Sequence, residues 1–202
     1  MLHCVAKYHC TLRDSLLNPD GVQLGPKFIP LDMHQYKNLL YSTRIPEKGM
    51  DRIHQPEAGF EPDHACALHK GHFYKIQVFN NGNVLSLTEI RNQIDAILKD
   101  GELRGTNPSP VCALSLTDRD LWADNRAHLA ALGKNEKLLD DIDNAMTLLV
   151  LDDFVNPSPS KSLEVAVGGP SNNRWSDKVW FKQNISLVSL KTTLQLKILI
   201  LK

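Results

Sequence analysis

The sequence predicts an α/β fold in which a mixed sheet is flanked by helices. Segments with apolar residues at helical spacing alternate along the chain with short, continuous apolar runs. The clearest helical segment covers residues 86–100, and the clearest apolar run covers residues 146–154. Such alternation is typical of proteins that layer helices on a sheet. A chain of 202 residues with 42% hydrophobic residues can form a core.

Composition excludes several classes of protein. Lys+Arg and Asp+Glu balance at 23 each, so no overall field favours nucleic acid. Four scattered cysteines do not make a secreted disulfide framework and favour a reducing compartment. Lys191 and Lys197 interrupt the most lipid-like segment, Ile185 to Leu201, so we expect no transmembrane span. The first 20 residues show no clear targeting peptide.

The amino-terminal third gives weak signals. Residues 1–29 are expected to be irregular, because Asn18-Pro19-Asp20-Gly21 and Gly25-Pro26 are turn sequences. Residues 31–45 carry apolar side chains at helical spacing and predict a short helix that ends before Pro46. Glycine, proline and acidic residues in 47–63 indicate a surface loop.

The central part gives stronger signals. Residues 64–69 and 72–79 predict a hairpin that turns at Lys70-Gly71. Ser86 and Glu89 have the spacing of a capping box, which predicts that a helix starts there. Further expected elements are a buried strand at 111–116, helices at 117–132 and 136–145, a buried strand at 146–154 and a strand in the carboxyl-terminal tail.

Two groups of histidine and cysteine were considered as zinc ligands: His3, Cys4, His9 and Cys10, and His64, Cys66, His69 and His72. The first has no familiar zinc spacing. In the second, neighbouring strand positions face opposite sides, so the side chains do not converge without help from the turn. We therefore expect no metal site, and read the second group as residues of a hairpin.

Other chemistry is equally sparse. Cys112 lies in an apolar run and is expected in the core, and Asp152-Asp153 are expected to finish a strand rather than to pair. No serine lies in a nucleophile elbow, and no phosphate-binding glycine loop is present. Arg174 and Asp177, beside Trp175, could form a fixed ion pair or orient a catalytic group. The residues alone leave both readings of this pair open.

Five blocks in one order resemble the carnitine/choline O-acyltransferase family, most closely its long-chain mitochondrial palmitoyltransferases: LDMHQYKNLLYSTRIP, KGHFYKIQVFNNGNVLSLTEI, LSLTDRDLWADNR, LLVLDDF and GGPSNNRWSDK. The resemblance covers residues 30–180. It implies part of a domain resembling chloramphenicol acetyltransferase, acyl-CoA and carnitine as substrates, no bound cofactor, and a mitochondrial location at the matrix side of the inner membrane, with peripheral membrane association.

The resemblance also implies a histidine general base about twenty residues after the Arg-Trp-x-Asp-Lys box, with Arg174 and Asp177 as site-supporting residues. In this sequence no histidine follows His128. The chain therefore divides into a non-matching amino terminus at 1–29, a partial acyltransferase domain at 30–180 and a divergent apolar tail at 181–202. We expect a fragment of a carnitine O-acyltransferase, inactive alone; the alternative is a non-catalytic partner that associates through the tail.

Overall fold

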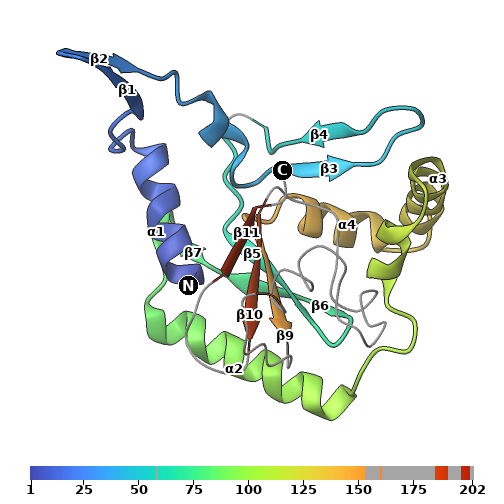
Figure 1. The fold of residues 1–202 in the computed structure, drawn as a ribbon. Coiled ribbons are helices and arrows are strands. Elements are labelled where there is room, and N and C mark those ends of the chain that lie inside the picture. Colours follow the sequence, from blue (N-terminus) through green and yellow to red (C-terminus); the bar gives the residue numbers. More distant parts are fainter. Residues whose placement is uncertain (58, 153–159, 161–184, 191–196, 201–202) are drawn as a thin grey trace.

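A computed structural model describes residues 1–57, 59–152, 160, 185–190 and 197–200. A five-stranded mixed sheet forms its centre, with the strand order β11-β10-β9-β5-β6 (Figure 1). Its strands are β5 (His64–His69), β6 (His72–Gln77), β9 (Leu148–Asp152), β10 (Ile185–Leu190) and β11 (Lys197–Ile200).

The three inner strands of this sheet are parallel, and the two outer strands are antiparallel to their neighbours. Strand β9 pairs with β5 on one side and with β10 on the other. Strands β6 and β11 then close the two ends as hairpin partners of β5 and β10. The predicted mixed sheet is therefore confirmed, and the tail does form strands: β10 pairs with the core strand β9, and β11 pairs with β10.

The two faces of the sheet pack against two separate hydrophobic cores, because successive side chains of a strand point to opposite faces. On β5, Ala65 and Ala67 belong to one core cluster, whereas Cys66 and Leu68 belong to the other. Successive side chains of a strand point to opposite faces, so this is the pattern of a strand buried on both sides. The first face is covered by α1 (Leu2–Arg13) and α2 (Leu87–Arg104), and the second by α3 (Arg119–Ala130) and α4 (Asn135–Asp143).

The predicted helices after residue 85 are confirmed, and their starts have physical causes. The Ser86 hydroxyl accepts a hydrogen bond from the Glu89 backbone N–H at 3.2 Å, and the Glu89 carboxylate accepts one from the Ser86 N–H at 2.8 Å. This is the predicted capping box. Helix α3 is capped by Asp118, whose side chain accepts from the Asp120 N–H. Within the described ranges, no helix is both long and apolar enough to cross a membrane.

The expectation of an irregular amino terminus is wrong. Residues Leu2–Arg13 form α1, and β1 (Gly21–Leu24) pairs with β2 (Lys27–Pro30) in a separate hairpin (Figure 1). No side chain caps the start of α1. The helix instead buries Leu2 and Ala6 in the first core cluster, and packing of this kind supplies most helix stability in proteins.

Three further expectations need correction. The region 31–45 holds only the 3₁₀ helix η1 (His34–Asn38) followed by β3 (Thr43–Ile45), and β3 pairs with β4 (Arg52–His54) from the predicted loop. The predicted strand at 111–116 is the 3₁₀ helix η2 (Val111–Leu116). Short apolar runs do not distinguish a strand from a helical turn by periodicity. A short hairpin of β7 (Phe79–Asn80) and β8 (Asn83–Val84) completes the fold.

Candidate functional site

The residues expected from the sequence to support an active site lie outside the part of the chain that the structure describes. Arg174 and Asp177 lie in 161–184, and Asp153 lies in 153–159. Their proposed roles stay predictions. Asp152 ends β9, as expected for a residue that finishes the strand, and Cys112 is fully buried in the second core cluster, as expected.

The four histidine and cysteine residues of the β5–β6 hairpin do not converge. The rings of His64, His69 and His72 each hydrogen-bond a different backbone carbonyl, those of Asp141, Leu151 and Gly105, at 2.7, 2.8 and 3.2 Å. Each imidazole nitrogen donates in these contacts, since a carbonyl only accepts. The hairpin histidines therefore tie β5 and β6 to α4, to β9 and to the segment after α2.

The amino-terminal histidines and cysteines also separate once α1 has formed. The His3 ring contacts the Leu85 carbonyl at 3.0 Å, whereas Cys4 is exposed. His9 instead faces Glu61, with 3.6 Å between Nε2 and the carboxylate. Across the described part of the chain, no group of three or more such side chains could hold a metal ion.

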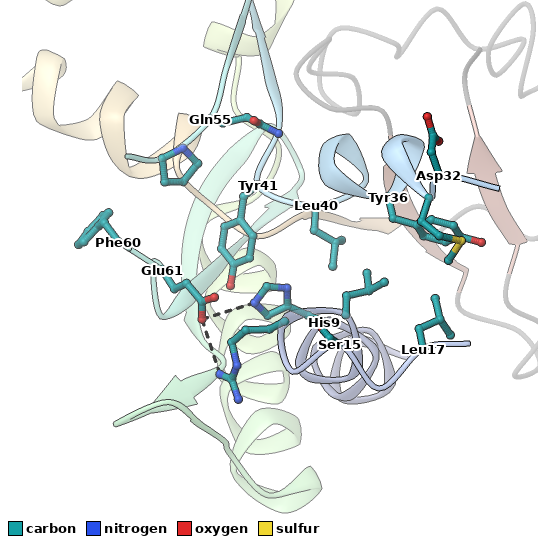
Figure 2. A pocket seen from close by; sticks show the side chains of 14 residues that line it. His9, Ser15, Leu17, Asp32, Tyr36, Leu40, Tyr41, Gln55, Phe60 and Glu61 are labelled. Carbon is teal, nitrogen blue, oxygen red and sulfur yellow. Dashed lines mark ion pairs between the residues drawn. The ribbon is translucent and has the colours of Figure 1, made fainter. Parts of the chain in front are cut away.

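A pocket of about 540 Å³ lies between α1, the segment around η1 and residues 55–61. Figure 2 shows that His9 and Glu61 meet at one end of it, while Asp32 and Tyr36 lie at the other. Apolar side chains, among them Leu12, Leu17, Met33 and Leu40, form much of the wall between the ends. The cavity is within the usual size range for small-molecule sites.

The charged end of the pocket combines a partly buried imidazole with a half-exposed carboxylate. The His9 side chain is 13% exposed and packs edge-on against Tyr41 and Phe79, with ring centroids 4.9 and 5.8 Å apart. Burial lowers the pKa of His9, and the nearby Glu61 charge opposes that effect. The Arg13 guanidinium is 3.6 Å from the same carboxylate but hydrogen-bonds Asp14 more closely, at 2.8 Å.

The opposite end is held by local hydrogen bonds. The Tyr36 hydroxyl donates to the Asp20 carboxylate at 2.6 Å, and this bond raises the pKa of Tyr36 to about 12. The Asp20 N–H contacts the Met33 sulfur at 3.0 Å. These contacts attach Asp20, which precedes β1, to η1 and hold two lining residues of the pocket, Met33 and Tyr36, in place.

Sequence reasoning missed this pocket because it missed α1. His9, Leu12 and Arg13 have the i, i+3, i+4 spacing of one helix face, but the segment has no cap signal and is rich in residues of weak helix propensity. Read as a helix, LHCVAKYHCTLR would have placed these three side chains together. Glu61 lies in a segment expected to be a loop and could not be paired with them.

Comparison with known proteins identifies the family. The sequence model of the choline/carnitine O-acyltransferases matches residues 1–184. Carnitine O-palmitoyltransferase 2, mitochondrial, from Bos taurus is 37% identical over 199 residues, covering 83% of this chain and 29% of that protein. The Homo sapiens protein of that name is 36% identical over 203 residues, with the same two coverages.

A more distant relative agrees with this result. The muscle isoform of carnitine O-palmitoyltransferase 1 from Rattus norvegicus is 28% identical over 197 residues, covering 94% of this chain and 24% of that protein. The chain thus spans less than a third of the length of these relatives. Because the family model matches 184 of the 202 residues, the chain belongs to the choline/carnitine O-acyltransferase family.

Proposed function

We propose that this chain is part of a carnitine O-acyltransferase, which moves an acyl group between acyl-CoA and carnitine in fatty acid metabolism. The observation that carries the proposal is the family match over residues 1–184. The relatives are named as carnitine palmitoyltransferases, which supports acyl-CoA and carnitine as substrates. The mixed α/β sheet is the expected framework for such a domain.

Within this function we assign the chain a supporting role. The resemblance implies that a histidine removes the proton from the carnitine hydroxyl or the CoA thiol, and a general base must be within hydrogen-bond reach of that proton. No histidine follows His128 in this sequence. Arg174 and Asp177 are proposed as scaffold for the site rather than as catalysts. The 202 residues alone are therefore expected to be inactive.

An exchange assay tests the expected inactivity. The purified chain is incubated with palmitoyl-CoA and carnitine, and release of CoA thiol is followed. We expect no turnover above that of an Arg174→Ala variant. Turnover of the unmodified chain that the variant lacks would show that these residues already contain a working base, and the assignment of a supporting role would be wrong.

A chimera tests whether the segment serves acyl transfer at all. Residues 30–180 replace the matching segment of the Bos taurus relative, and the carnitine palmitoyltransferase activity of the chimera is measured. We expect measurable activity that Arg174→Ala in the chimera lowers by at least tenfold, about the effect of misplacing a catalytic group. The exposed Lys137→Ala is the matched control. A folded but inactive chimera would contradict the proposal.

We also propose a mitochondrial location with peripheral association at the inner membrane. The Bos taurus and Homo sapiens relatives are named as mitochondrial, which supports the location. Fractionation of cells that express the tagged protein in its native form tests it. The protein should sediment with mitochondria and be released from their membranes by alkaline carbonate. Recovery in another fraction would contradict the location.

A second candidate function is a non-catalytic partner of a complete acyltransferase. The observation that favours it is β11, which lies at one end of the sheet with no strand beyond it in the described residues. An edge strand of this kind can pair with another chain. Co-elution of this chain with the Bos taurus relative, lost when residues 182–202 are removed, would support the idea. Separate elution of the two proteins would remove it.

A further inference from the structure

The pocket beside α1 contains a buried hydrogen-bonding atom that its surroundings do not satisfy. Nε2 of His9 is buried and has no hydrogen-bond partner among the described residues. Buried polar atoms in native proteins are nearly always bonded, so an exception calls for an explanation. We propose that this pocket binds a small ligand that carries a primary ammonium group on an apolar body.

The charged end of the pocket can accept hydrogen bonds from a donor group. Burial lowers the pKa of His9, and in the neutral form of an imidazole one of the two nitrogens can accept a hydrogen bond. The Glu61 carboxylate is 3.6 Å from both His9 and Arg13, which is beyond hydrogen-bond distance. A primary ammonium group has three N–H donors and no acceptor. Placed beside Glu61, it can donate to the carboxylate and, when the His9 ring carries its proton on Nδ1, also to His9 Nε2 (Figure 2).

The charges around the pocket favour a cation. Glu61 and Asp32 line it at its two ends, and Arg13 is the one cationic side chain among its described lining residues, apart from the titratable His9. Arg13 is already bonded to Asp14 through two nitrogens, at 2.8 and 3.3 Å. The two carboxylates outnumber this one guanidinium among the described lining residues, which favours a cationic ligand over an anionic one.

The walls define the body of the ligand. Leu17 and Leu40 lie between Glu61 and Asp32 (Figure 2), and Leu12 also lines the pocket. A cavity of about 540 Å³ holds an alkyl or aryl group of roughly six to ten carbons with room for water. Burial of such a group adds affinity in proportion to its apolar area. A bare ammonium ion would not gain this contribution.

The backbone around the pocket is strained. Ser15, Met33 and Tyr41 have φ values of 55°, 58° and 58°, and all three line the cavity. They are three of the five non-glycine residues with positive φ in the described part of the chain. Such conformations cost energy and cluster at ligand sites, where the surrounding structure holds them in place. The clustering is an observation independent of the charges and supports a built site.

The experiment is a titration calorimetry series with the 202-residue chain at pH 7. Hexylamine is the probe, hexan-1-ol tests the need for charge, and hexyltrimethylammonium tests the need for N–H donors. We expect hexylamine to bind at one saturable site and both comparison compounds to bind at least about tenfold more weakly, since hydrogen bonds to charged groups are stronger than neutral ones.

Two variants locate the binding. Glu61→Gln removes the charge, and His9→Phe removes Nε2 while an aromatic ring still packs on Tyr41 and Phe79. Each variant should bind hexylamine at least about tenfold more weakly than the original chain does. Glu57→Gln, an exposed carboxylate that does not line the pocket, is the matched control and should have no effect. Circular dichroism confirms that each variant is folded.

Three results would overturn the proposal. The first is no saturable binding of hexylamine. The second is equal binding of hexyltrimethylammonium, which would show attraction by charge alone. The third is an equal loss of affinity in Glu57→Gln and Glu61→Gln, which would place the binding outside this pocket. If one pocket variant fails to fold, the other and the comparison compounds still decide the outcome.

Discussion

Gly101 lies where helix α2 crosses the end of strand β5, and its missing side chain makes room for His69. A Cβ atom at position 101 would meet the His69 ring at 2.2 Å. His69 is 1% exposed and held by its bond to the Leu151 carbonyl, so it cannot move aside easily. Gly101→Ala should therefore lower the free energy of unfolding by about 1–3 kcal/mol despite the better helix propensity of alanine.

Urea unfolding of the Gly101→Ala variant measures this difference. Leu103→Ala is the control, because Leu103 is 80% exposed two residues further along the same helix. The control should change the free energy of unfolding by less than about 0.5 kcal/mol. A Gly101→Ala variant as stable as the original chain would show that His69 does not pack against α2 as described.

His64 should make the stability fall in mild acid. Burial lowers its pKa below the ordinary value of 6.5. The unfolded chain therefore takes up a proton that the folded chain resists, and stability decreases as pH falls below about 6.5. Burial lowers the pKa of His9 in the same direction. Near pH 7.5 these two histidines should make no contribution to the pH dependence of the free energy of unfolding. At pH 5.5 they should lower that free energy.

Unfolding of His64→Gln at both pH values isolates the first of these contributions. Glutamine can still donate to the Asp141 carbonyl, which the His64 ring contacts at 2.7 Å, but it does not titrate. The variant should lose less stability than the original chain between pH 7.5 and 5.5. Substitution of the exposed His34 by glutamine is the control. An unchanged pH dependence in His64→Gln would contradict the assignment.

At the scale of elements, the start of α2 is determined by a local sequence signal, the capping box at Ser86 and Glu89. Both reciprocal bonds of the capping box are present, and Ser86 is exposed, so no tertiary contact accounts for its effect. Ser86→Ala should lower the free energy of unfolding by about 1 kcal/mol. Thr88→Ala, exposed in the first turn, should be neutral or slightly stabilising. Thermal or urea unfolding of the two variants separates a cap effect from a general serine or threonine effect.

Helices α3 and α4 are joined by a largely buried ion pair. Arg126 contacts the Asp143 carboxylate, and the two side chains are 15% and 6% exposed. Arg126→Met removes this partner and leaves a carboxylate in the interior, so it should cost about 3–5 kcal/mol. The surface pair Lys48–Asp124 is 66% and 61% exposed, and Lys48→Met should leave the free energy of unfolding almost unchanged. Similar losses of stability in Arg126→Met and Lys48→Met would contradict the expected effect of burial on the two ion pairs.

The elements that sequence reasoning found are those whose signal is local. The box at Ser86 and Glu89, the turn at Lys70-Gly71 and the apolar run 146–154 are each contained in a few residues, and each predicts an element that the structure contains, the last as the strand Leu148–Asp152. Helix α1 depends instead on Leu2 and Ala6 packing in a core built from β5, β9 and α2. The pocket follows the same rule, since it joins α1 to Glu61 across some fifty residues of chain.

At the scale of the whole molecule, the family was predictable while the chemistry of a site was not. Five ordered blocks indicate the acyltransferases, and the family match at residues 1–184 agrees with them. The blocks say little about individual contacts. His69, considered as a metal ligand, in fact bonds the Leu151 carbonyl, because pairing of β5 with β9 brings together residues about eighty positions apart. Such register is set by the hydrophobic pattern of a whole sheet rather than by any short motif.

The tail decides whether the sheet has an exposed apolar edge. Strand β10 pairs with β9 along Leu148 to Asp152, and without it the described part of the sheet would end at β9. Residues 148–151 of β9 are Leu-Leu-Val-Leu, and an exposed edge strand of this composition promotes association between chains.

A chain ending at residue 184 should therefore be less stable and elute at a larger apparent size than the 202-residue chain. Val188→Pro should act in the same direction, because proline removes a ladder hydrogen bond. Light scattering after size exclusion measures both variants. The second candidate function makes the opposite prediction, because there the tail joins one chain to another. A decrease in apparent size on removal of the tail would therefore contradict the role of β10 as the cover of β9.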